Sequence, residues 1–258
     1  MRHVEHVMGT VFSFDLRHEP SGALRAALAA AVGLLHRVDE VFSTYRADSP
    51  VSRLRRGEIT LAECPDEVAE VLALCEEAAA VSSGYFTGAP GGRLDPSGMV
   101  KGWAVERASA VLRAAGATRH CVNGGGDVRV SGEPEPGRPW RVGVAHPCRP
   151  GELVTVVSGR DLAVATSGTA ERGPHIVNPR TGAPATGLAS VTVVAETLTR
   201  ADAMATAAFA MGEAARGWAE RQTGLEAFAV TASGAMWWTG GFPRYGLVGA
   251  AQPSKPML

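Results

Sequence analysis

Apolar residues recur every three or four positions along several stretches of the chain, which is the spacing of helices that bury one face. The clearest stripe consists of Leu24, Leu28, Leu35, Val38 and Phe42. Proline, glycine and capping residues mark where such segments begin and end. Together these signals predict helices over residues 24–42, 48–54, 65–84, 102–115, 199–211 and 213–222.

Other stretches alternate apolar and polar residues or form short apolar runs, and both patterns predict strands. The predicted strands cover residues 7–16, 120–123, 128–131, 140–147, 153–158, 161–168, 190–195, 226–231 and 236–238. Neither an internal repeat nor a clean linker interrupts this series of elements. We therefore expect residues 1–258 to form a single domain.

The composition is that of an ordinary folded protein, with 258 residues, 45% hydrophobic and 20% charged. The formal net charge of −1 gives no basic surface for nucleic acid. No apolar run is long enough to span a membrane, and the N-terminal stretch alternates, unlike a secretory signal. The four cysteines show neither a CxxC pair nor metal-like spacing. We expect a cytoplasmic protein with reduced cysteines, no membrane span and no nucleic-acid partner.

The stretch 94–111 joins a turn to the start of a predicted helix. Residues 95–98 form the turn, and the apolar spacing that follows places Lys101 in the first helical turn. The first N–H groups of a helix lack helical partners and carry partial positive charge. Together with the mobile cation of Lys101 and the small Gly98, they have the features of a phosphate site. The alternative is a helix capped by Ser97, with a solvated lysine.

Asp202 and Thr206 lie four residues apart on predicted helix 199–211, so their side chains leave the same face. One interpretation makes Thr199 the N-cap and Asp202 part of a near capping box. The other makes the carboxylate and the hydroxyl ligands of a hard cation, because Mg²⁺ prefers oxygen ligands. The rest of the helix is rich in alanine and methionine, which predicts burial. Burying an unpartnered acid is costly, so we favour the ligand interpretation.

Two loops carry further polar groups. Three glycines at 124–126 separate two predicted strands and predict positive φ angles or a close backbone approach, with Asp127 directly after them. Their spacing is not the dinucleotide-binding fingerprint, and the chain has no GxxxxGK[ST] loop. The loop 165–182 carries many hydrogen-bonding side chains, among them His175. A lone histidine is more often structural than catalytic.

In this order, the motifs resemble those of the ApbE family of FAD:protein FMN transferases. The resemblance covers most of the chain. Its motifs are Met8-Gly9-Thr10, Phe42-Ser43-Thr44-Tyr45-Arg46, residues 95–102, residues 123–127, residues 165–168, residues 175–182 and residues 201–207. The chain departs from the family at Phe86-Thr87-Gly88-Ala89, where members usually carry Phe-Asp-Pro-Thr. The segment between Tyr45 and Asp95 is also short.

The resemblance implies an α+β fold, with mixed or antiparallel β-sheets packed with helices and an FAD cleft between the sub-structures. It implies that Mg²⁺ is bound by the Gly98 carbonyl and by the side chains of Asp202 and Thr206. The residues implied to line the FAD site are Met8, Tyr45, Phe86, Asp95, Lys101 and Ile176. The implied reaction moves FMN from FAD to a threonine or serine hydroxyl of a target protein and releases AMP.

Within this implied reaction, His175 is the candidate general base, because a reference pKa of about 6.5 suits neutral operation. Lys101 would add positive potential beside the phosphates. Asp127 and Asp202 are weaker candidates for the base, because a structural role and a metal-bound role are expected of them. Three alternatives stay open: an FAD pyrophosphatase, a flavin-binding protein without chemistry, and an unrelated α/β enzyme acting on sugars or nucleotides.

Overall fold

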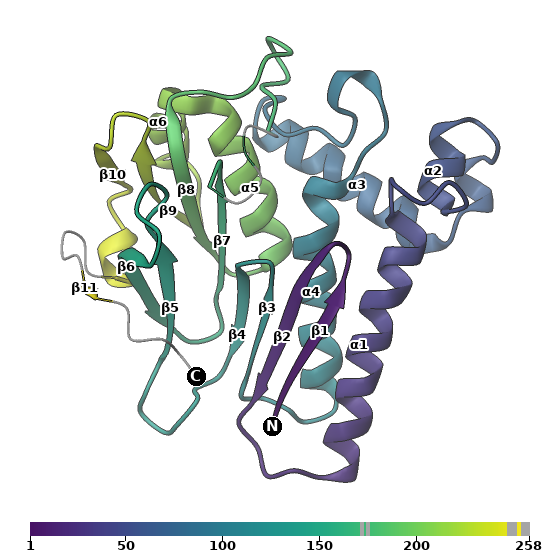
Figure 1. Ribbon diagram of the computed structural model, residues 1–258, viewed down its shortest axis with the longest axis vertical. Helices are drawn as coiled ribbons and strands as arrows, with labels where there is room; N and C mark the ends of the chain where they lie inside the picture. Colours follow the sequence, from purple (N-terminus) through teal and green to yellow (C-terminus); the bar gives the residue numbers. More distant parts are fainter. Residues whose placement is uncertain (171–172, 174–175, 247–251, 254–258) are drawn as a thin grey trace.

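A large antiparallel sheet forms the centre of the computed structural model, which describes residues 1–170, 173, 176–246 and 252–253 (Figure 1). Its strands follow the order β1-β2-β3-β4-β7-β8-β9-β10. Their bounds are β1 Arg2–Val7, β2 Thr10–Leu16, β3 His120–Gly124, β4 Asp127–Ser131, β7 Ala163–Gly168, β8 Leu188–Ala195, β9 Leu225–Thr231 and β10 Met236–Trp238. A second sheet has the order β11-β6-β5, with β5 Trp140–Ala145, β6 Glu152–Gly159 and β11 Gln252–Pro253.

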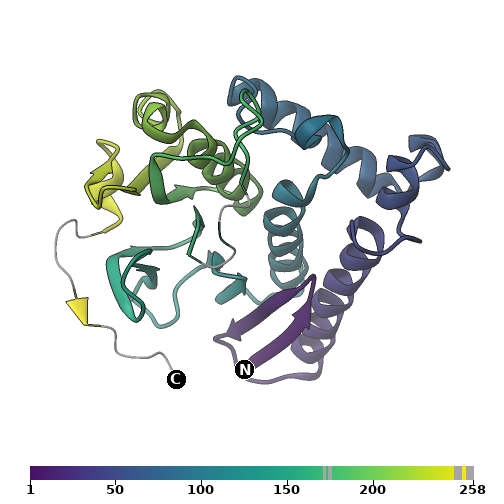
Figure 2. The ribbon, with the colours of Figure 1, turned by 45° about the horizontal axis from the view of Figure 1, so that its top comes forward.

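Helices cover one face of the large sheet, and the small sheet covers part of the other (Figures 1 and 2). The helices are α1 Gly22–Phe42, α2 Pro50–Arg55, α3 Asp66–Val81, α4 Ser97–Ala114, α5 Leu198–Met211 and α6 Ala215–Ala219. Short 3₁₀ turns occupy Leu61–Glu63, Pro90–Gly92, Gly212–Ala214 and Phe242–Arg244. The predicted α+β class is therefore confirmed, and the strand pairings that the structure describes are antiparallel.

Two hydrophobic cores follow from this layering, one on each face of the large sheet. Strand β8 shows the reason, because all of its residues are buried. Val191 and Val193 point into the core shared with the helices, whereas Val194 points into the core shared with β5 and β6. Successive side chains of a strand alternate between faces, so a strand covered on both sides is mostly apolar, and the polar residues Ser190 and Thr192 of β8 are buried with the rest. Strand β1 at the sheet edge instead alternates exposed and half-buried residues.

The structure moves several element boundaries predicted from the sequence. Residues 7–16 are not one strand, because Met8 and Gly9 form the turn of the β1–β2 hairpin, and Met8 adopts a positive φ of 54°. Helix α5 begins at Leu198 with Thr197 as its N-cap, so the capping interpretation with Thr199 is wrong. Residues 213–222 divide into a 3₁₀ turn and the short α6. Residues of similar local propensity compete at such ends, and tertiary contacts decide among them.

Helix α4 also begins earlier than its apolar spacing predicts. It starts at Ser97, with Pro96 at the cap position, so Lys101 is its fifth residue and Ser97 is not the cap. The Ser97 N–H instead donates to Asp95 Oδ1 at 3.1 Å, and the fixed φ of proline suits a helix start. In Figure 1 the β1–β2 and β3–β4 turns lie at about the middle height of the molecule, at the upper ends of their strands, whereas the α1–α2 loop lies higher, at the upper end of α1.

Candidate functional site

Helices α4 and α5 pack unusually closely, and Gly102 makes this possible. A Cβ placed on Gly102 would lie 2.6 Å from the Leu198 carbonyl oxygen and 2.7 Å from the Asp202 Cβ. The Gly102 N–H donates to Asp202 Oδ2 at 2.9 Å across the helix interface. A glycine inside a helix costs roughly 0.5–1 kcal/mol relative to alanine. Here it brings a buried carboxylate of α5 against the backbone of α4.

A lysine bridges two buried carboxylates beside this contact. Lys101 Nζ contacts Asp127 Oδ2 and lies 3.1 Å from Asp202 Oδ2. The lysine side chain is 22% exposed, whereas those of Asp127 and Asp202 are 3% and 8% exposed. Asp127 begins β4 after the tight Gly125–Gly126 turn, and its Oδ1 accepts the Thr166 N–H of β7 at 2.9 Å. Three elements distant in sequence thus place one cation between two anions.

Gly98 and Thr206 adjoin the same cluster. A Cβ on Gly98 would lie 3.9 Å from Thr206 Cγ2 and 3.4 Å from the ring of Phe86. Thr206 follows Asp202 by one helical turn and is partly buried. The structure therefore brings together the three residues predicted to bind a metal. Phe86 is only 1% exposed and packs under Gly98 as part of the core.

The donor set at this place fits a hard divalent cation. A carboxylate, a hydroxyl and a backbone carbonyl are the oxygen ligands that Mg²⁺ accepts. The Gly98 carbonyl oxygen has two lone pairs, so it can accept a helical hydrogen bond and still offer an oxygen to a cation. The Lys101 ammonium already occupies a cation position against Asp202. Within the described ranges, no group of three His, Cys, Asp or Glu side chains could hold a metal.

The start of α4 also offers hydrogen-bond donors to an anion. The Ser97 N–H is taken by Asp95, and the Met99 and Val100 N–H groups donate to the Pro96 carbonyl at 2.8 and 3.1 Å. Among the described residues, none accepts the Gly98 N–H. Together with Lys101 one turn further on, this N–H can bind a phosphate oxygen. The phosphate interpretation of the helix start is thus compatible with the geometry.

The other predicted residues lie outside this cluster. Met8 is partly buried in the β1–β2 turn, whereas Tyr45 in the α1–α2 loop is 99% exposed. Asp95 holds the turn before α4, since its N–H donates to the Gly88 carbonyl at 2.8 Å. Ile176 packs against the main core, and His175 lies outside the described residues. The flavin-lining roles of Met8, Tyr45, Phe86, Asp95 and Ile176 stay predictions.

Asp127 is the residue of the cluster for which we expect only a structural role from the sequence. Its motif is visible as a glycine turn followed by an acid at the start of a buried strand. A buried acid requires a partner, which is the signal that could have identified it. A second buried pair supports the same junction: Arg129 Nε lies 3.1 Å from Glu106 Oε1, and Glu106 Oε2 accepts the Leu198 N–H at 2.7 Å.

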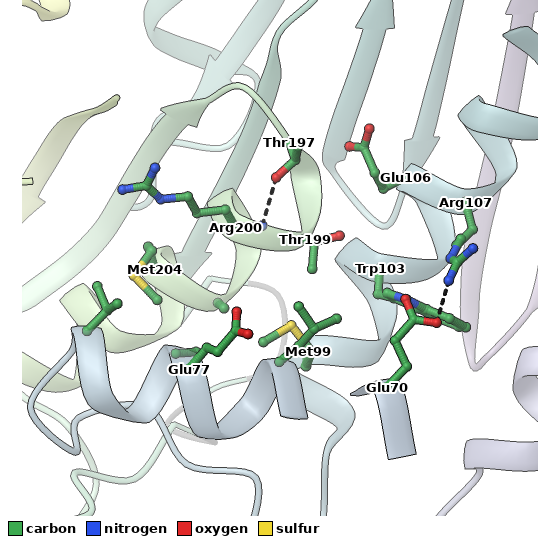
Figure 3. Close-up of a pocket in the computed structure, with 14 residues that line it drawn as sticks. Glu70, Glu77, Met99, Trp103, Glu106, Arg107, Thr197, Thr199, Arg200 and Met204 are labelled. Atoms are coloured by element: carbon green, nitrogen blue, oxygen red, sulfur yellow. Dashed lines mark hydrogen bonds and ion pairs between the residues drawn. The ribbon is translucent and has the colours of Figure 1, made fainter. Parts of the chain in front are cut away.

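A pocket of about 510 Å³ is lined by residues of α3, α4 and the first part of α5 (Figure 3). Met99, Trp103, Ala203 and Met204 are among its lining residues, and none of the predicted site residues line it. At 100° per residue, these positions leave faces different from those of Lys101 and Asp202. Its carboxylates are Glu70, Glu77 and Glu106. Arg107 and Arg200 also line it, so its charge does not distinguish this pocket from the lysine cluster.

One buried pair has the residue types of a catalytic dyad but is structural. His120 Nε2 lies 2.7 Å from Ser109 Oγ, and both residues are 0% exposed. The histidine Nδ1 lies 2.5 Å from the Ala117 carbonyl oxygen. Burial lowers the pKa of His120 to about 4, so the imidazole is neutral at pH 7. No substrate reaches either side chain, and the pair fixes α4 to β3.

Comparison with known proteins agrees with this arrangement. The model of the ApbE family matches residues 8–92 and 87–229. The FAD:protein FMN transferase of Haemophilus influenzae is 31% identical over 46% of this chain and 38% of the relative. That of Rhodobacter capsulatus is 37% identical over 48% of this chain and 25% of the relative. The chain thus matches less than half of the length of these relatives.

A solved structure extends the comparison to the whole fold. The crystal structure of the ApbE protein from Thermotoga maritima superposes with a TM-score of 0.86 and 23% identity. The superposition covers 95% of this chain and 98% of the other. At this identity the likeness establishes the fold. None of the helices that the structure describes is long and apolar enough to cross a membrane.

Proposed function

The chain belongs to the ApbE family, and from this premise we propose that it transfers FMN from FAD to a threonine or serine hydroxyl of a target protein. The observation that carries the proposal is the Lys101 ammonium held between Asp127 and Asp202, with Gly98 and Thr206 beside it. A diphosphate requires positive charge, which the Lys101 ammonium and the helix start supply, and its counter-ion requires anionic oxygens, which Asp202 supplies. The family relatives named above are FAD:protein FMN transferases.

We further propose Mg²⁺ as the cofactor, held by the Gly98 carbonyl, the Asp202 carboxylate and the Thr206 hydroxyl. When bound, such an ion polarises the diphosphate and stabilises the negative charge on the departing AMP. The donor chemistry supports this choice, because all three groups are oxygens. Lys101 and the Gly98 N–H would bind the remaining phosphate oxygens.

In the proposed reaction, the acceptor hydroxyl oxygen forms a bond to the FMN-side phosphorus, and the bond from that phosphorus to the AMP oxygen breaks. The hydroxyl proton must leave, and His175 is the proposed base that takes it. A positioned base contributes about 10²–10⁴-fold to such a step. Met8 lies in the β1–β2 turn and Tyr45 in the exposed α1–α2 loop, and both are proposed flavin contacts on the family resemblance.

The decisive experiment combines the purified chain with FAD, Mg²⁺ and a candidate acceptor protein. Mass spectrometry of the acceptor should detect covalent FMN, and chromatography should detect AMP in equal amount. FMN and AMP released without any modified acceptor would identify hydrolysis by water instead. FAD that stays intact in every incubation would contradict both enzymatic functions and leave a flavin-binding protein.

A further inference from the structure

Asp127 has no assigned role in the reaction, yet it contacts the same ammonium as the proposed metal ligand Asp202. We propose that Asp127 is the positioning residue of Lys101: it retains the ammonium when a divalent cation displaces it from Asp202. The inference rests on the proposed function and adds a residue that controls cation affinity.

The charges of the cluster make such an exchange possible. One ammonium contacts two carboxylates, so the three side chains carry one net negative charge when all are ionised. Lys101 can neutralise only one of the two acids fully. A divalent cation that binds Asp202 therefore leaves a neutral Lys101–Asp127 pair, and no buried charge remains without a partner. Without Asp127, the displaced ammonium would lose its only other carboxylate contact among the described residues.

The two carboxylates differ in how they are held, and this sets the direction of the exchange. Asp127 Oδ1 is fixed by the Thr166 N–H, and its backbone follows a rigid turn in which the Gly125 N–H donates to the Val11 carbonyl at 3.0 Å. A Cβ on Gly125 would lie 2.8 Å from Thr10 Oγ1, so the turn is packed against β2. Asp127 is thus a fixed anchor inside the sheet.

Asp202, in contrast, keeps one oxygen available. Its Oδ2 accepts the Gly102 N–H and contacts Lys101, whereas none of the described residues donates to its Oδ1. Thr206 lies one turn away on the same helix face. A cation can therefore approach Asp202 from the side of Thr206 while Lys101 stays with Asp127. Lysine suits this movement, because its ammonium ends a flexible four-carbon stem.

The test measures Mn²⁺ binding to the full chain without flavin, by loss of the electron paramagnetic resonance signal of free Mn²⁺. The variant Asp127→Asn keeps an oxygen for the Thr166 N–H but loses the charge that holds Lys101. The ammonium then competes for Asp202, and we expect the Mn²⁺ dissociation constant to rise about 10- to 100-fold. The double variant Asp127→Asn/Lys101→Met removes the competitor and should bind Mn²⁺ as tightly as the wild type.

Asp161→Asn is the matched control. Asp161 Oδ1 also accepts a backbone N–H, that of Gly132 at 2.9 Å, and no described lysine contacts it. This variant should leave the Mn²⁺ affinity unchanged, and its melting temperature is the reference for that of Asp127→Asn. A purely structural role of Asp127 would lower the melting temperature without moving the Mn²⁺ affinity.

Three results would overturn the inference: unchanged Mn²⁺ affinity in Asp127→Asn, no recovery in the double variant, or no Mn²⁺ binding by the wild type. The assay contains neither FAD nor acceptor, so it separates this inference from the proposed function. If the Mn²⁺ affinities of the variants follow the expected order but the chain transfers no FMN, only the proposed function is removed. FMN transfer together with unchanged Mn²⁺ affinity in Asp127→Asn would remove only the role of Asp127.

Discussion

Replacing Gly102 by alanine tests the close contact on which the site depends. The added Cβ would lie 2.6 Å from the Leu198 carbonyl oxygen, 2.7 Å from the Asp202 Cβ and 3.1 Å from Asp202 Oδ2. The first two neighbours are a backbone atom and the root of a side chain, so neither can rotate away. Helices α4 and α5 must therefore separate, and overpacking of this kind costs about 1–3 kcal/mol.

Gly33→Ala supplies the matched control. Gly33 lies inside α1, and an added Cβ there meets nothing within 4 Å. Both substitutions gain the helix propensity of alanine, about 1 kcal/mol. That gain cancels when the two variants are compared, so the difference in their unfolding free energies isolates the clash. We expect Gly102→Ala to be less stable than Gly33→Ala by about 1–3 kcal/mol.

The assay is urea unfolding of the wild type and both variants, with the midpoint and the slope measured in each. Gly33→Ala should shift the midpoint upward, whereas Gly102→Ala should fall below it by the amount of the clash. Mn²⁺ binding should weaken in Gly102→Ala as well, because Asp202 moves with α5. Equal stability of the two variants would refute the close packing of α4 on α5.

Four further predictions follow from individual residues. Burial lowers the pKa of His120 to about 4 from its ordinary value of about 6.5, so between these values only the unfolded chain binds this proton. The contribution to stability is fully present above pH 6.5 and should fall by about 3 kcal/mol toward pH 4. His120→Gln should remove that proton from the pH slope measured by urea unfolding. Tyr45→Ala removes a side chain that is 99% exposed, so it should change the free energy of unfolding by under about 0.5 kcal/mol. FAD titration of this variant should show weaker binding. An unchanged FAD affinity would exclude Tyr45 from the flavin site. Asp202→Asn or EDTA should abolish FMN transfer to the acceptor, and an Asp202→Asn variant as active as wild type would remove the metal assignment. His175→Ala should retain FAD binding but lose turnover, and full turnover would remove the base assignment.

The sequence by itself determined most elements of the fold and the identity of the metal-ligand candidates. Apolar spacing located α1, α3 and the strand β8, because burial of a face repeats with the period of the element. The i, i+4 spacing placed Asp202 and Thr206 on one helix face without any tertiary information. Motif order led to the family that the family model then matched over residues 8–92 and 87–229.

The exact helix starts were not determined locally. Thr197 and Thr199 can both cap α5, and only the packed structure, in which Glu106 binds the Leu198 N–H, selects Thr197. The hairpin turn at Met8 was missed for a similar reason. A positive φ is unusual outside glycine, so the alternating residues read as one continuous strand.

Only the tertiary structure decided which charges meet. Lys101, Asp127 and Asp202 come from α4, β4 and α5, and their contact depends on how the helices pack on the sheet. The local spacing of apolar residues indicates whether a position is buried, but it does not indicate which residue from a distant part of the sequence contacts it. Gly102 shows the difference most clearly, because a glycine inside a helix lowers helix stability and the sequence offers no reason for it. The structure gives the reason: a Cβ at this position would lie 2.6 Å from the Leu198 carbonyl oxygen of the neighbouring helix.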